Sequence, residues 1–270
     1  MNVLFIGGGN MADALIGGLL KGGFAANQIR AVEIDGAARR RLSDKYRIEC
    51  AAESRGTVRP GEVVVFAVKP QQMKEAARFA GIKDNANLVI SIAAGVTLAS
   101  LAGWLGGHAK LIRAMPNTPA LIGAGVTGLY ALPGVSEAEK KQAETILGAV
   151  SATVWIPDEA LMDAVTAVSG SGPAYVFWFI EQLAAAGESL GLNQETSRKL
   201  AIETVLGSAK LAAQSADSPA ALRERVTSKG GTTEAALKAF EEQKLAERFL
   251  RAVEAARDRG AELGRLMEKE

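Results

Sequence analysis

The chain has 270 residues, of which 48% are hydrophobic and 23% charged, so it can bury a large core and form two domains. Its formal net charge is +1 and no run of like charges is longer than Arg39–Arg41, so nucleic acid is not expected as the main partner. The single cysteine, Cys50, and the single histidine, His108, exclude an internal disulfide and a Cys/His zinc site, and we expect no metal site.

Two long uncharged stretches raise the question of membrane spans. Residues 85–109 and 114–136 lack charged side chains, but glycines divide the first and three prolines divide the second. A lipid-facing helix disfavours such interruptions. The beginning of the sequence also lacks the basic region of a secretory signal. We therefore expect no membrane segment, no export and a cytoplasmic location, which the lone cysteine also favours.

The first half of the sequence alternates between apolar runs and helical patterns. Apolar runs of this kind, separated by helices, indicate a parallel sheet that is covered on both faces. Thr97 is positioned to open a short helix after the fourth strand. The predicted strands are residues 3–7, 29–34, 63–68, 88–92 and 152–156, with more strand between 109 and 130, and the predicted helices are 10–20, 37–46, 71–79 and 137–147.

Beyond Pro157 the pattern becomes almost entirely helical. Helices are predicted at 173–190, 195–214, 234–241 and 244–267. The first of them contains AYVFWFIEQL, which is apolar on every side and must therefore be buried all round. In a domain of this size, such burial favours a subunit interface. We predict an α/β fold with a Rossmann-type domain at 1–157, followed by an all-helical domain at 158–270.

The segment that follows the first strand fits the dinucleotide-binding pattern G-x-G-x-x-A. Gly7 allows the tight turn, Gly9 lets the backbone approach a pyrophosphate, and the small Ala12 lets helix and sheet pack closely. Asn10 and Met11 begin the helix whose free N–H groups would hold the phosphate charge. The alternative is a glycine turn that serves packing only, but the strand–turn–helix context favours a nicotinamide dinucleotide.

The choice between NAD and NADP stays open at the level of sequence. Glu33 ends the second strand, where an acid bonds the ribose 2′-hydroxyl of NAD and repels the 2′-phosphate of NADP. Arg39, Arg40 and Arg41 follow closely, and one of them could bind that phosphate. They could equally form a solvated helix face.

Further residues at the carboxyl ends of the predicted strands are candidates to line the cofactor's path, because ligands of open parallel sheets bind there. Lys69 could also be an ordinary exposed lysine, and Asn117, in the loop MPNTP, could bond a ligand or only its own turn. We interpret His108, in the glycine-rich segment WLGGHAK, as a surface residue outside the catalytic site. The cofactor candidates of this group are Ala67, Val68, Lys69, Pro70, Ala93, Ala94 and Asn117.

The segment VTSKGGTTEAAL, residues 226–237, places hydroxyl side chains around a Gly-Gly pair just before a helix. Thr232 or Thr233 could simply be the N-cap of that helix. Alternatively, bare backbone N–H groups, hydroxyls and the helix dipole form a pocket for a small anion such as a carboxylate. SGSGPAY, residues 169–175, is a second glycine-hydroxyl loop that could be a cap or a substrate contact. The sequence contains no histidine–carboxylate pair, which favours reduction of an already protonated C=N bond, since that reaction needs mainly positioning.

Six motifs in order resemble one known family along nearly the whole chain: FIGGGNMADALIGGL, AVKP, SIAAG, MPNTPA, GSGPAY and TSKGGTT. The family is that of the pyrroline-5-carboxylate reductases, which catalyse the last step of proline biosynthesis. The resemblance implies a C-terminal helical dimerisation domain, a homodimer that often assembles into a larger ring such as a decamer, and reduction of 1-pyrroline-5-carboxylate to L-proline by NADPH or NADH.

The resemblance also implies roles for individual residues. The substrate carboxylate would bind the loop from Ser228 to Thr233, on backbone N–H groups of Gly230, Gly231 and Thr232, and the Thr233 hydroxyl would contact the ring nitrogen as the catalytic residue. The chain departs from the family pattern at Lys229, where proline is usual, and at Glu33, where a small polar residue is common. Two other functions compete: a β-hydroxyacid dehydrogenase, whose helical lysine is missing from residues 173–191, and a non-catalytic dinucleotide sensor.

Overall fold

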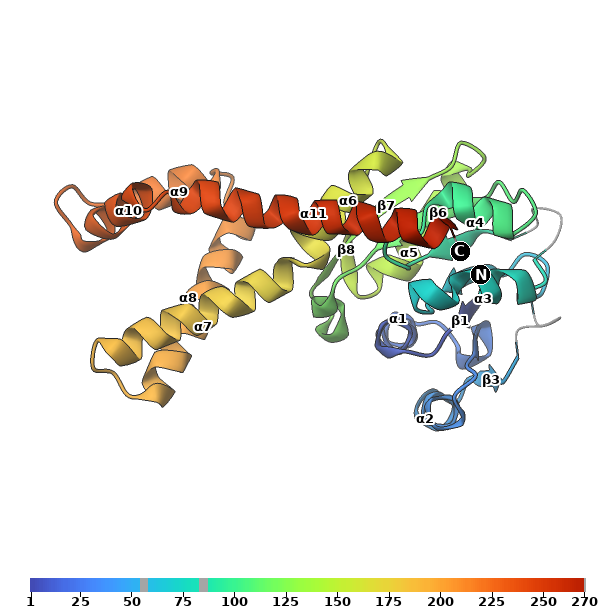
Figure 1. Cartoon of the computed structure of the whole chain (residues 1–270). Helices are drawn as coiled ribbons and strands as arrows, with labels where there is room; N and C mark the ends of the chain where they lie inside the picture. The colour runs from blue at the N-terminus through green and yellow to red at the C-terminus, as the bar shows by residue number, and fades with distance from the viewer. Residues whose placement is uncertain (54–57, 83–86, 270) are drawn as a thin grey trace. The chain divides into compact units, whose positions relative to one another are not determined.

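The computed structural model describes residues 1–53, 58–82 and 87–269 (Figure 1). The chain divides into two compact units. The first contains Met1–Ser171 together with Ala256–Glu270, and the second contains Gly172–Ala255. The sheet therefore shares its unit with the last stretch of the C-terminal helix, which no local sequence pattern indicates.

The first unit is built on one sheet, with the strand order β3-β2-β1-β4-β5-β6-β7-β8. Neighbouring strands from β3 to β6 are parallel, which is the order expected for a Rossmann-type fold. The predicted strands are confirmed, and β3 is an addition that the sequence analysis missed. The strands are β1 (Val3–Ile6), β2 (Ile29–Val32), β3 (Glu49–Ala51), β4 (Val63–Phe66), β5 (Val89–Ser91), β6 (Leu111–Met115), β7 (Gly125–Ala131) and β8 (Ser151–Trp155).

The sheet is mostly parallel, as predicted, but one pair of strands departs from this pattern. Strand β7 is antiparallel to β6, and β8 is parallel to β7. The connection from residue 116 to 124 contains only a short 3-10 helix, Thr118–Ile122, and is shorter than the dozen or so residues of a parallel crossover. The chain therefore returns beside β6 in the opposite direction.

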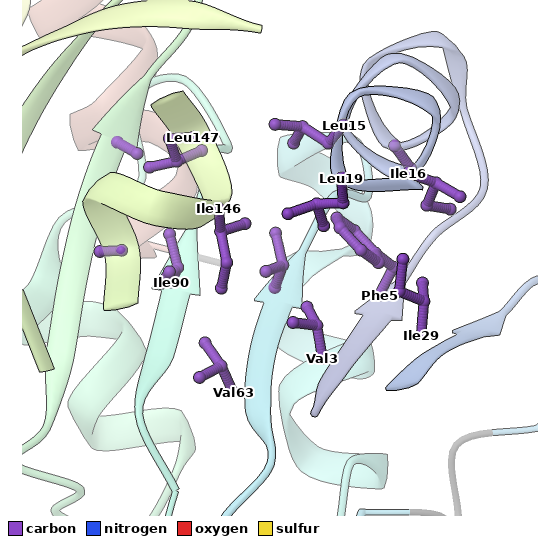
Figure 2. Close-up of a cluster of buried hydrophobic side chains, with 14 of the residues drawn as sticks. Val3, Phe5, Leu15, Ile16, Leu19, Ile29, Val63, Ile90, Ile146 and Leu147 are labelled. Atoms are coloured by element: carbon purple, nitrogen blue, oxygen red, sulfur yellow. The ribbon is translucent and has the colours of Figure 1, made fainter. Parts of the chain in front are cut away.

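Alternate residues of the central strands form two hydrophobic cores, one on each face of the sheet. Val3 and Phe5 of β1 belong to the core that includes Leu15 of α1 and Leu147 of α5 (Figure 2). The intervening Leu4 belongs to the other core, which contains residues of α3 and α4. The expected coverage of both faces is thus confirmed. The helices of this unit are α1 (Asn10–Lys21), α2 (Gly36–Tyr46), α3 (Met73–Phe79), α4 (Leu98–Trp104), α5 (Glu137–Gly148) and α6 (Met162–Val165).

The second unit is helical. Helices α7 and α8 form a hairpin, in which Gly187 allows close packing because an added Cβ would lie 2.8 Å from the Ser197 hydroxyl oxygen. The apolar residues of α7 remain largely uncovered in one chain, with Phe177 64% and Trp178 56% exposed. The helices are α7 (Gly172–Ser189), α8 (Gln194–Gln214), α9 (Pro219–Arg225), α10 (Thr232–Glu242) and the first part of α11 (Leu245–Lys269), which ends in the first unit.

The helices of the structure can be compared with what a membrane span requires. Within residues 1–53, 58–82 and 87–269, no helix combines the length and the apolar character needed to cross a bilayer. The long α7 is apolar for only part of its length, and α11 is strongly amphipathic.

Candidate active site

The turn after β1 has the geometry that the glycine pattern predicts. Gly7 has a φ of 103°, and an added Cβ would lie 2.5 Å from the carbonyl oxygen of Ala67, so only glycine fits. This close approach brings the ends of β1 and β4 together, and the Ala67 N–H donates to the Ile6 carbonyl at 2.7 Å. Ala12 is buried against the sheet, as its small size predicts.

The start of α1 is open toward solvent. An added Cβ at Gly9 would meet no atom within 4 Å, and Gly9 caps the helix without any side-chain hydrogen bond. The N–H groups of the first turn, which begins with Asn10 and Met11, therefore keep their capacity to bind an anion. This open backbone, next to the tight turn at Gly7, fits the pyrophosphate of a dinucleotide.

Glu33 is held against this turn. Its Oε2 accepts from the Gly8 N–H at 2.7 Å, and its Oε1 accepts from the Asp35 N–H at 2.8 Å. The carboxylate is thereby fixed at the end of β2, beside the phosphate-binding turn, which is the position from which an acid meets the ribose 2′-hydroxyl.

The arginines of α2 divide into different environments. Arg39 donates to the carbonyl oxygens of Glu33 and Ile34 at 2.8 and 3.3 Å, and Arg41 donates to the Gly8 carbonyl at 3.2 Å. Two of the three guanidinium groups thus lie at the predicted adenosine end of the cofactor site. Arg39 is half-buried, so the alternative of a solvated helix face does not hold for it, whereas Arg41 is exposed and the alternative stays open there.

The strand-end candidates occupy two loops at the same edge of the sheet. Ala67 and Val68 are half-buried, Lys69 is exposed and Pro70 begins a short 3-10 helix. In the neighbouring loop, Ala93 is only 3% exposed and packs in the core, whereas Ala94 is more accessible. Of this pair, Ala94 is the one whose side chain can approach a ligand.

Asn117 has both ends of its side-chain amide engaged. Its Nδ2 donates to the Ser169 carbonyl at 3.1 Å, and its Oδ1 accepts from the Val126 N–H at 2.9 Å. These bonds join three segments of the first unit, which favours the structural alternative for this residue over a ligand contact.

The segment SGSGPAY is not the loop that the sequence suggested. Residues Thr166–Gly170 form a π-helical turn, and α7 begins at Gly172. The Ser169 hydroxyl donates to the Val165 carbonyl at 2.9 Å, within this turn. Gly170 allows close packing here, because an added Cβ would lie 2.6 Å from the methyl carbon of Met115.

The glycine pair before α10 resolves the question of the helix cap. The helix begins at Thr232, and the capping residue is Gly231, with no side-chain cap. The alternative that a hydroxyl of Thr232 or Thr233 caps the helix is therefore wrong. Both threonines lie in the first turn, where backbone N–H groups have no intrahelical acceptor.

The predicted anion-binding amides are partly occupied by the chain itself. The Gly230 N–H donates to Glu234 Oε2 at 2.6 Å, and the Gly231 N–H donates to the Ser228 carbonyl at 2.9 Å. A carboxylate thus already lies on one of these amides, which shows that the loop geometry accepts such a group. Ser228 and Lys229 are exposed.

His108 is buried, so the expectation of a surface residue is wrong. It is 4% exposed, and its Nε2 lies 2.8 Å from the Asn87 carbonyl oxygen. Burial lowers the pKa of the imidazole below its usual value, against the opposing effect of that hydrogen bond. The sequence did not reveal this burial, because the hydrogen-bond partner of His108 lies 21 residues away and no local pattern indicates it.

The sequence analysis also missed a buried charge cluster in the first unit. Arg113 lies 3.3 Å from Glu159 and 3.4 Å from Asp163, and its side chain is 6% exposed. Glu159 Oε1 in turn accepts from the Leu98 N–H at the start of α4, at 2.7 Å. The apolar run LIRAM around a single arginine was the signal that could have revealed it. Among the described residues, no group of three or more His, Cys, Asp or Glu side chains could hold a metal ion.

A Rossmann sheet with an open dinucleotide turn, combined with a helical unit that carries a glycine-led, uncapped helix start, defines the class of dinucleotide-dependent oxidoreductases with a helical C-terminal domain. Two family models match separate stretches of the chain. Residues 2–95 match the model "NADP oxidoreductase coenzyme F420-dependent", and residues 159–263 match "Pyrroline-5-carboxylate reductase dimerisation".

Curated relatives and solved structures extend the match to almost the whole chain. The pyrroline-5-carboxylate reductase of Pseudomonas aeruginosa is 46% identical over 262 residues, 97% of this chain and 96% of that protein. The structure of a pyrroline-5-carboxylate reductase from Coxiella burnetii is 40% identical with a TM-score of 0.91, over 97% of this chain and 98% of that one. A Plasmodium falciparum pyrroline carboxylate reductase with NADP bound is 28% identical with a TM-score of 0.84, over 98% of both chains. The chain belongs to the pyrroline-5-carboxylate reductase family, and the resemblance stated from its motifs is confirmed.

Proposed function

We propose that this protein reduces 1-pyrroline-5-carboxylate to L-proline with NADPH or NADH, the final step of proline biosynthesis. The observation that carries the proposal is the agreement of two parts of the molecule with one reaction. The turn at Gly7–Gly9 fits a dinucleotide, and the start of α10 presents N–H groups suited to a small carboxylate. Family membership over nearly the whole chain then selects this substrate.

The cofactor would be held by the first unit. The first turn of α1 would bind its pyrophosphate, Glu33 or the arginines beside it would bind the adenosine ribose, and Ala94 with Lys69 and Pro70 would border the nicotinamide. When bound, the reduced nicotinamide supplies a hydride from C4 to C5 of the imine. The fixed turn at Gly7 and the braced Glu33 would hold the pyrophosphate and the adenosine end of the cofactor in place.

The substrate would be held by the loop 228–233 and the first turn of α10. Gly230 can offer its N–H to the substrate carboxylate only when Glu234 moves away, whereas Thr232 and Thr233 lie in the uncapped first turn. The Thr233 hydroxyl would contact the ring nitrogen and hold its proton. Because the reacting C=N group is protonated before hydride arrives, positioning and this one polar contact are sufficient.

Assembly follows from the helical unit. The large apolar side chains of α7 that one chain leaves exposed, including Phe177 and Trp178, would be covered by a second copy. The match of residues 159–263 to a dimerisation family supports a homodimer, and a larger ring such as a decamer could be built from such dimers. We place this assembly in the cytoplasm, without a nucleic-acid or membrane partner.

The test follows oxidation of NADH and NADPH by absorbance, with 1-pyrroline-5-carboxylate and with a panel of keto acids and hydroxy acids. Activity on keto acids alone would reject the proposal in favour of a β-hydroxyacid dehydrogenase. Cofactor binding without turnover of any of these substrates would favour the dinucleotide sensor.

Thr233→Ala tests the catalytic assignment. We expect kcat to fall by on the order of tenfold to a hundredfold, because the hydroxyl oxygen that would accept from the protonated ring nitrogen is lost. The affinity for the cofactor should stay unchanged. Thr227→Ala is the matched control, since its hydroxyl donates to the Arg223 carbonyl at 2.7 Å and has no assigned contact with substrate. Equal kcat/KM for Thr233→Ala and the wild type would mean that the hydroxyl does not serve the reaction.

A further inference from the structure

The end of helix α11 lies very close to the loop that follows β5. Gly264 is buried, and an added Cβ there would lie 2.8 Å from the carbonyl oxygen of Gly95. That distance is shorter than side-chain atoms tolerate, and the obstacle is backbone, which cannot rotate away. One turn earlier, an added Cβ at Gly260 would meet nothing nearer than Asp163 Oδ1 at 3.7 Å, which is an ordinary contact. The close approach is therefore specific to Gly264.

The loop that Gly264 touches, residues 92–97, is also fixed from its two ends. At its start, the Ile92 N–H donates to the Phe66 carbonyl at 3.1 Å. At its end, the Leu98 N–H donates to Glu159 Oε1 at 2.7 Å. Gly95 itself has a φ of 77°, so the loop follows a left-handed path at this residue. α11 covers the loop at this point.

The charge cluster around Arg113 holds the second of these ends. Arg113 is buried and contacts both Glu159 and Asp163. A buried guanidinium requires its carboxylate partners, so Glu159 is kept in the orientation that accepts from Leu98. The contact between α11 and the loop thus belongs to a rigid part of the first unit.

The two glycines near the end of α11 differ in whether alanine could replace them. Each glycine in a helix interior costs about 1 kcal/mol relative to alanine. At Gly264 alanine is prevented by the loop, and at Gly260 the surroundings would admit it. The contact with the loop therefore requires glycine at position 264 and not at position 260.

We infer that Gly264 is a positioning residue for the nicotinamide end of the cofactor, which it acts on through Gly95 and the loop 92–97. This inference rests on the proposed function, in which Ala94 of that loop borders the nicotinamide. The helix end sets how far the loop can move, and the loop sets the place of the ring. The adenosine end, bound near Glu33 and Gly8, lies on other loops and does not depend on Gly264.

Two alanine variants and two ligands test the inference. The affinities of Gly264→Ala and Gly260→Ala for NADH and NADPH are compared with their affinities for ADP-ribose, which lacks the nicotinamide. Of NADH and NADPH, we consider the one that the wild type binds more tightly. We expect Gly264→Ala to bind it about tenfold more weakly, because the added Cβ would displace the loop by roughly half an ångström. Its affinity for ADP-ribose should equal that of the wild type. Gly260→Ala should bind both ligands as the wild type does.

The outcomes separate this inference from the proposed function. A wild-type protein that binds neither reduced cofactor would reject the proposed function. A wild type that binds them normally, with Gly264→Ala unchanged or with ADP-ribose weakened by the same factor, would overturn the inference alone.

If Gly264→Ala does not fold, Glu159→Ala provides the same comparison from the other end of the loop, because it removes the acceptor of the Leu98 N–H. It should weaken the reduced cofactor and leave ADP-ribose unchanged. Glu159→Gln, which keeps an acceptor oxygen, should fall between Glu159→Ala and the wild type. Equal effects of Glu159→Ala on the two ligands would overturn the inference.

Discussion

Replacing Glu33 by serine should move the cofactor preference from NADH toward NADPH. The carboxylate is fixed at the end of β2 by the N–H groups of Gly8 and Asp35, so it cannot turn away from an incoming 2′-phosphate. Serine removes the charge and leaves a hydroxyl. Arg39, whose guanidinium already reaches the Glu33 and Ile34 carbonyls, then becomes the nearest counter-charge for the phosphate.

The size of the shift can be worked from this geometry. A carboxylate and a phosphate of charge about −1.5, roughly 6 Å apart in surroundings of dielectric constant about 40, repel by about 2 kcal/mol. That energy corresponds to roughly a thirtyfold change in affinity for NADPH. Loss of a charged hydrogen bond to the ribose hydroxyl weakens NADH by about 1.5 kcal/mol or more. The NADPH-to-NADH ratio of kcat/KM should therefore rise by roughly four hundredfold, the product of the two effects.

The assay measures kcat/KM for both cofactors at saturating 1-pyrroline-5-carboxylate. The ratio is the informative quantity, because any loosening of the turn at Gly8 affects both cofactors and cancels. Glu33→Gln is the matched control, because it keeps an acceptor oxygen but carries no charge. Its cofactor ratio should rise only by the part that comes from removing the repulsion of the 2′-phosphate. A ratio unchanged by both substitutions would refute the reasoning and show that Glu33 does not face the ribose.

Two further predictions concern stability and assembly. Burial lowers the pKa of His108 in the folded protein, so the unfolded chain binds the proton more readily. The stability that comes from neutral His108 is therefore present above about pH 6.5 and is lost as the pH falls below that value. Urea unfolding from about pH 7 to about pH 5 should therefore cost the wild type more stability than His108→Gln, and parallel losses would contradict this. Trp178 is 56% exposed on α7, so Trp178→Glu should place a charge in the proposed dimer interface and give monomers by light scattering, with helical content retained. Persistence of the wild-type assembly in this variant would place the interface elsewhere.

Local signals in the sequence were enough for most strands of the Rossmann-type sheet and for the turn after β1. The tight turn at Gly7 follows from a strand, a glycine and a helix start that are adjacent in the chain. Thr97 caps α4 as predicted, with its side chain accepting from the Ser100 N–H at 3.2 Å, because a cap depends only on neighbouring residues. The family resemblance rested on motifs of this same local kind.

Features that depend on distant partners were decided only by the tertiary structure. Glu33 accepts a hydrogen bond from Gly8, 25 residues away, and buried His108 is hydrogen-bonded to the Asn87 carbonyl. No periodic pattern in the sequence indicates either contact. The contact between Gly264 and Gly95 joins the last helix to a loop in the first half of the chain. Sequence patterns record the preferences of single elements, such as a strand, a cap or an apolar face. Which elements meet, and at what distance, follows from packing the whole chain.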